Sequence, residues 1–148
     1  MSAITLAQVC DAIEGVLDDA TTLARSQSYD ELTEGVHDCP QLQVYPAAGG
    51  QDVGTDTDRS SFQAGVRQTG FTIHADYYAK AVSHVAEGME ALVDGIDAMQ
   101  NELEKQDTGA KFGLEGIKSM RWNWEMVQFQ AGQTLYIGAR FLITVRVY

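Results

Sequence analysis

The sequence predicts an α+β fold: a two-layer sandwich in which two helices pack on one face of an antiparallel sheet of about four strands. Two stretches place apolar residues three and four positions apart, the pattern of a helix with one buried side. Two stretches near the end of the sequence alternate apolar and polar residues, the pattern of strands with one buried face. Such elements combine into a two-layer sandwich, in the order helix, strand, strand, helix, strand, strand.

The first helix is expected at residues 6–23, with Thr5 as its N-cap. Its apolar stripe is Leu6, Val9, Cys10, Ile13, Val16, Leu17, Ala20 and Leu23. Gln8 stands three residues after Thr5, as in a capping box. Because Cys10 lies in the stripe, we interpret it as a small buried hydrophobe. Only Cys39 accompanies it, so we predict no disulfide framework, and a reduced, cytoplasmic compartment fits best.

A polar stretch at residues 25–40 has no clear period, and a short strand is expected at residues 41–45, ended by Pro46. A flexible loop rich in Gly and Asp is expected at about residues 47–61. Loops of this length are often functional, so it is a candidate assembly loop. The candidate residues are Gly49, Gly50, Asp52, Gly54, Asp56 and Asp58. The aspartates do not form an EF-hand, because Arg67 stands where that loop needs Glu, and we interpret the loop as solvated.

The next strand is expected at residues 71–77, and the second helix follows it. The apolar stripe of this helix is Val82, Val85, Met89, Leu92, Val93, Ile96, Met99 and Leu103. Its other side carries an acidic stripe: Glu87, Glu90, Asp94, Asp97 and Glu104. A solvated face is the simplest interpretation of that stripe. The alternative is an acidic wall that faces a channel or a basic partner.

Two strands are expected at the end of the sequence, joined by a turn at residues 131–133. In the first, Met120, Trp122, Trp124 and Met126 share one side. In the second, Ile137, Ala139, Phe141, Ile143, Val145 and Val147 share one face, and Arg140, Thr144 and Arg146 lie on the other. The two tryptophans either pack in the core or anchor an interface.

The formal net charge of −11 is unevenly distributed. Residues 1–58 contain 11 acids and one base, whereas residues 59–148 contain 10 acids and nine bases. The acidic first part disfavours binding to phosphate backbones and to anionic membranes, and it is compatible with basic protein partners. No apolar run approaches the roughly 20 residues that span a bilayer. The first residues also do not have the pattern of a secretory signal.

No phosphate loop, dinucleotide fingerprint or nucleophile elbow occurs in the sequence. His37 and Cys39 are the only close pair of soft ligands, and only Cys10 could join them, whereas a zinc site needs three or four ligands. We therefore predict no catalytic residues, no cofactor and no metal. The least favoured alternative is a small enzyme that uses scattered residues such as His74, His84 and Asp76.

Four segments follow one another along nearly the whole sequence: the helix ITLAQVCDAIEGVLDDATTL, the strand LQVYP, the long helix with its acidic side, and the hairpin MRWNWEMVQFQAGQTLYIGARFLITVRVY. In order, size and pattern of elements, this chain resembles the tail terminator proteins of tailed bacteriophages, and the wider group of tail-completion and neck proteins. The resemblance involves no sharp motif. It implies a single tail-terminator-like domain over residues 1–148.

The resemblance also implies a structural virion protein with no catalytic residues. Such proteins form a hexameric ring on the last ring of the tail tube, stop its polymerisation and join the tail to the head or neck, while DNA passes through the channel as cargo. The implied partners are further copies of the chain, the tail tube protein and head-side connector or neck proteins, with no membrane. The implied location is the virion, and the host cytoplasm during assembly. An acidic protein-binding adaptor unrelated to phage is the alternative.

Overall fold

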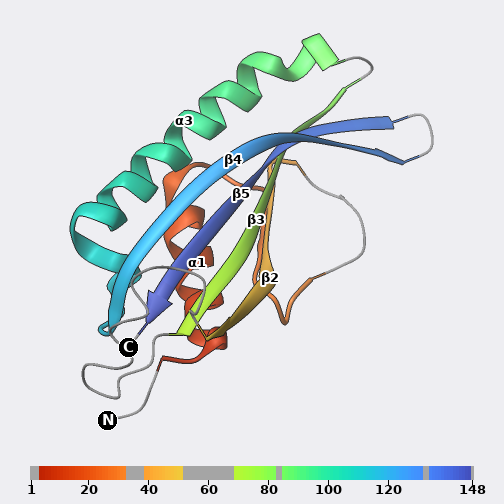
Figure 1. The fold of residues 1–148 in the computed structure, drawn as a ribbon. Helices are drawn as coiled ribbons and strands as arrows, with labels where there is room; N and C mark the ends of the chain where they lie inside the picture. Colours follow the sequence, from red (N-terminus) through yellow and green to blue (C-terminus); the bar gives the residue numbers. More distant parts are fainter. Residues whose placement is uncertain (1–3, 33–38, 52–68, 83–84, 132–133, 148) are drawn as a thin grey trace.

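The computed structural model describes residues 4–32, 39–51, 69–82, 85–131 and 134–147, and it has an α+β fold, as the sequence predicts (Figure 1). The elements are α1 (Leu6–Ala20), β1 (Arg25–Gln27), β2 (Gln41–Gln51), β3 (Thr69–Val82), η2 (Val85–Gly88), α3 (Met89–Lys105), η3 (Gln106–Ala110), η4 (Lys111–Gly113), β4 (Ile117–Ala131) and β5 (Thr134–Val147). The strands form one sheet in the order β1-β2-β3-β5-β4. All neighbouring strands are antiparallel except β1 and β2, which are parallel.

The sequence-based count of about four strands is wrong, because the sheet has five. The missed strand is β1, which contains only three residues and pairs with Gln41–Gln43 of β2. Its residues Arg25, Ser26 and Gln27 are all polar, so no apolar alternation marks it. The described order is therefore helix, three strands, helix, two strands.

The expectation that Pro46 ends the strand at residues 41–45 is also wrong, because β2 continues to Gln51. β1 pairs only with the first three residues of β2, so the described sheet has its edge at β2 from Val44 onward. An edge strand tolerates proline, and a register shift between Pro46 and Ala48 accommodates the irregular backbone. The first residues of the expected loop, 47–51, are thus strand, and residues 52–61 lie outside the described part of the chain.

The second helix begins later than the apolar stripe predicts. Val82 is the last residue of β3 and pairs with Leu135, and α3 starts at Met89 after the short helix η2. Gly88 joins the two helices in a confined space, since a Cβ there would lie 2.8 Å from Val82 Cγ1 and 2.9 Å from Ile137 Cδ1. The strand end and the helix share one apolar layer, which is why their residues look like one continuous helical stripe.

The start of α1 confirms the capping box. Thr5 Oγ1 accepts a hydrogen bond from the Gln8 backbone N–H (3.2 Å), and Gln8 Oε1 accepts one from the Thr5 N–H (2.9 Å). Cys10 is a buried free thiol with 1 % of its surface exposed, as interpreted from the sequence. Burial, with a smaller contribution from Asp11, raises the pKa of Cys10 to about 11. The helix ends at Ala20 rather than Leu23.

Both helices lie on the same side of the sheet (Figure 1). α1 contacts β1, β2 and β3, and α3 contacts β3 and β5. The core between the layers includes the fully buried Leu17, Leu42, Ile73, Met99 and Phe141. α3 approaches the sheet closely at Gly95, where an added Cβ would lie 2.3 Å from Tyr77 Oη. The β4–β5 hairpin is paired from Ile117–Val147 to Ala131–Thr134, and it reaches past the helices at one end of the sheet (Figure 1).

Candidate functional site

The face of the sheet that points away from the helices is polar, and we call it the open face. Along β5 its residues are Arg140, Leu142, Thr144 and Arg146, which alternate with buried residues that face the helices. The strand register adds Tyr45, Thr72, His74, Asp76, Tyr78, Arg121, Asn123 and Glu125 from the neighbouring strands. Among the described residues no helix covers this face, so it is the natural candidate for contact with another molecule.

Tyr45, Asp76 and Arg140 form a hydrogen-bonded network that connects three strands of the open face. Arg140 Nε donates to Asp76 Oδ1 (2.8 Å), and Arg140 Nη2 donates to Asp76 Oδ2 (3.2 Å). Tyr45 Oη donates to Asp76 Oδ2 (2.5 Å) and accepts from Arg140 Nη2 (3.3 Å). Asp76 is only 4 % exposed, and its burial is stabilised because both carboxylate oxygens are paired.

The electrostatics of this network favour a structural role. Burial raises the pKa of Tyr45, and the hydrogen bond to Asp76 raises it further. The same carboxylate raises the pKa of Arg140 through its hydrogen bond. The phenol therefore stays protonated, and Asp76 accepts from two donors instead of offering a free base. His74 packs edge-on against Tyr45, with ring centroids 5.4 Å apart and an interplanar angle of 81°.

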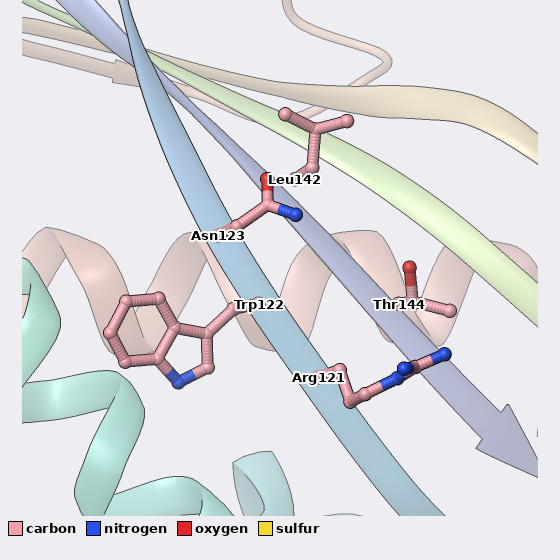
Figure 2. A pocket seen from close by; sticks show the side chains of 5 residues that line it. All are labelled: Arg121, Trp122, Asn123, Leu142 and Thr144. Carbon is pink, nitrogen blue, oxygen red and sulfur yellow. The ribbon is translucent and has the colours of Figure 1, made fainter.

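Two shallow hollows lie farther along the open face and share Thr144. One, of about 380 Å³, is lined by Arg121, Trp122, Asn123, Leu142 and Thr144 (Figure 2). The other, of about 290 Å³, is lined by Ala48, Gly49, Gly50, Gly70, Thr72, Thr144 and Arg146. Figure 2 shows the Arg121 side chain reaching toward Thr144, while Trp122 leaves β4 in the other direction. The two hollows together form a strip that crosses β4, β5, β3 and β2, with Arg121 and Asn123 at its β4 end, Gly50 at its β2 end, and Thr144 and Arg146 between them.

Charge is divided between the two layers of the fold. The helices α1 and α3 contain nine acids and one base, Lys105. The five strands contain two acids and six bases, namely Arg25, Lys80, Lys118, Arg121, Arg140 and Arg146. Among the described residues of the open face, both acids, Asp76 and Glu125, stand opposite Arg140, whereas Arg121 stands opposite Thr144, and Arg146 opposite Gly70 and Ser119.

The acidic stripe predicted from the sequence is exposed on the helical side of the molecule. Glu87 lies in η2, and Glu90, Asp94, Asp97 and Glu104 lie on α3. Of the predicted assembly loop, Gly49 and Gly50 belong to β2 and line the smaller hollow, on the opposite side of the sheet. The remaining loop candidates, Asp52, Gly54, Asp56 and Asp58, lie outside the described residues.

The two tryptophans of β4 differ in their surroundings. Trp122 is half-buried and packs against the core. Trp124 is 40 % exposed, and its Nε1 donates to Gln100 Oε1 on α3 (3.0 Å). Core packing is therefore the role of Trp122, whereas Trp124 leaves apolar surface available beside α3.

His74 and Asp76 share the open face, but the Asp76 carboxylate is already paired, and His84 and His37 lie outside the described residues. Within the described ranges, no group of three or more His, Cys, Asp and Glu side chains is arranged to hold a metal ion. None of the helices described is long and apolar enough to cross a membrane.

Sequence reasoning did not find the Tyr45–Asp76–Arg140 network. Its members are separated by 31 and 64 positions along the chain, and only the strand register brings them together. One signal was present: Asp76 is the only acid within the long apolar and aromatic strand β3. A buried carboxylate in such a strand needs a cationic partner, and the last strand, β5, contains two arginines.

No protein-family model matches this chain, and no curated protein is similar to it in sequence.

Proposed function

We propose that this chain is a structural protein of the tail terminator or tail-completion class of tailed bacteriophages. In this role it forms a ring of six copies that caps the tail tube and joins it to the head or neck while DNA passes through the channel. The proposed partners are further copies of the chain, the tail tube protein and head-side neck proteins. The proposed location is the virion, after assembly in the host cytoplasm.

The observation that carries this proposal is the arrangement of the sheet around its last hairpin. β4 has 15 residues and lies at the edge of the sheet, with β5 as its one neighbour among the described strands. A long strand edge exposes backbone N–H and C=O groups, which proteins cover or protect against uncontrolled pairing. A neighbouring copy that covers β4 and the open face beside it would satisfy this need. The sequence of elements, with a helix before a closing hairpin, fits the resemblance to tail terminators.

A second function, an adaptor for a basic protein, is favoured by one feature. The acids of α3 form an exposed row, Glu90, Asp94, Asp97 and Glu104, with no base among them. Such a surface attracts basic partners at low ionic strength. The adaptor would act as a monomer, whereas the ring protein associates with itself.

Native mass spectrometry of the purified chain over a concentration series separates the two functions. The ring proposal expects one closed oligomer whose share grows with concentration, with negative-stain electron microscopy showing annular particles of uniform diameter. A ladder of open oligomers of every size would contradict closure. A monomer at all concentrations, combined with salt-sensitive binding to a basic protein, would favour the adaptor.

A further inference from the structure

Two surfaces of this chain have opposite charge and face in opposite directions. The described residues that line the strip of the open face include Arg121 and Arg146 and no acid, and α3 presents exposed acids on the helical side. We propose that the strip binds the acidic side of α3 from a second copy of this chain. The proposal rests on the ring function and names the contact that would build the ring.

The spacing of the charges fits such a contact. Arg121 is paired with Thr144 and Arg146 with Ser119, so the two arginines are diagonal neighbours on adjacent strands, roughly 7–8 Å apart at the backbone. Acids three or four positions apart on a helix are about 5–6 Å apart between Cβ atoms. Arg121 and Arg146 can therefore reach successive acids of α3, such as Asp94 and Asp97.

The strip also has a shape and polar groups that suit the binding of one side of a helix. Thr72 and Thr144 place their hydroxyls 3.4 Å apart on its floor, and Gly50 and Gly70, which pair with each other on β2 and β3, keep the smaller hollow open. Arg121 is exposed and makes no hydrogen bond or ion pair with any described side chain, so its guanidinium is available to bind carboxylates. Hydroxyl and guanidinium donors facing a row of acids give an interface in which the polar groups are paired.

The geometry of the contact makes it head-to-tail. Each copy has the strip on one side of its sheet and α3 on the other, so a copy that receives a helix still offers its own helix to a further copy. A heterologous contact of this kind generates a ring when the rotation between copies closes. A helix laid over the strip would also shield the β4 side of the sheet.

The test uses charge reversal on each surface of the full-length chain. The strip variant is Arg121→Glu with Asn123→Glu, and the helix variant is Asp94→Lys with Asp97→Lys. All four positions are exposed. Each variant should raise the dissociation constant of the oligomer by tenfold or more, on the order expected for removing charge pairs at an interface. The control for the helix variant, Asp18→Lys with Asp19→Lys, makes the same charge change at two exposed positions of α1 and should leave the oligomer intact.

Mixing the two variants gives the decisive result. The strip variant then offers an acidic strip to the basic helix of the other, and the remaining contacts are as in the wild type. The mixture should regain the oligomer, with the two chains alternating, and native mass spectrometry resolves this by their mass difference. Recovery also shows that both variants are folded.

Four outcomes would overturn the contact. If both variants assemble like the wild type, the ring stands but this contact does not form. If each variant fails to assemble and their mixture fails too, the two surfaces do not meet. If the strip variant only loses binding to duplex DNA while its oligomer is unchanged, the strip serves nucleic acid. A wild-type chain that is monomeric at every concentration would contradict the contact together with self-assembly.

Discussion

Asp76 and Arg140 lie directly opposite each other on β3 and β5, joined by two hydrogen bonds of 2.8 and 3.2 Å. Arg140 has a second acid, Glu125, opposite it on β4, but that carboxylate is exposed and makes no ion pair among the described residues. The same arginine thus has one buried and one exposed acidic neighbour. This pair of acids allows a matched test of what burial of the carboxylate contributes to the free energy of unfolding.

Replacing Asp76 with Ala should lower the free energy of unfolding by about 1–3 kcal/mol, because Tyr45 and Arg140 then lose their shared acceptor. Glu125→Ala should change it by less than about 0.5 kcal/mol. Urea denaturation at neutral pH measures both. Equal effects of the two substitutions would show that the buried network does not stabilise the sheet more than a surface charge does.

The two helices contain glycines that should respond in opposite ways to alanine. Gly95→Ala places a Cβ against the Tyr77 ring and should destabilise the fold by about 1–3 kcal/mol, since α3 must move away from β3. Gly15 lies inside α1 at an exposed position, with nothing within 4 Å of an added Cβ. Gly15→Ala should stabilise the fold by roughly 0.5–1 kcal/mol. Thermal unfolding that moves in the same direction for both would contradict the packing of α3 on Tyr77.

Glu14 should make stability depend on pH. Burial raises its pKa above the ordinary 4.5, and Asp18, Glu31 and Asp11 add to this, although the hydrogen bond from the Ser26 hydroxyl lowers it. The ionised side chain therefore costs stability at neutral pH. This cost disappears as the pH falls through the folded-state pKa and is absent below about 4.5, where the side chain is protonated in both states.

Glu14→Gln removes the charge and keeps an acceptor for Ser26. It should be more stable relative to the wild type at pH 7 than at pH 4, and chemical denaturation at a series of pH values measures the difference. A difference between the two proteins that does not change with pH would show that the pKa of Glu14 is not raised by folding.

Trp122 and Trp124 should differ in how much each contributes to the free energy of unfolding. Trp122→Ala removes a half-buried ring from the core and should cost roughly 1.5–3 kcal/mol. Trp124→Ala removes an exposed ring and one hydrogen bond to Gln100, and should cost about 0.5–1.5 kcal/mol. The urea concentration at the midpoint of unfolding should be lower for Trp122→Ala than for Trp124→Ala. The reverse order would mean that Trp124 contributes more to packing than Trp122 does.

The local patterns were sufficient to predict much of the architecture. The capping box at Thr5 and Gln8 marked the start of α1, and the alternation of the last run predicted which face of β5 is buried. Both depend only on residues close in sequence. The predictions failed where a neighbouring element decided the outcome: the polar strand β1 exists through its pairing with β2, and Pro46 is tolerated because β2 is an edge there.

By itself, the sequence determined that this protein has two helices, strands with one buried face, and an acidic side on its second helix, because helical and strand periods are local properties of the chain. Only the tertiary structure decided that Asp76 meets Arg140 and that Arg121 and Arg146 line one strip. These pairs depend on the register between strands far apart in sequence, and a slip of one residue would turn each side chain to the other face.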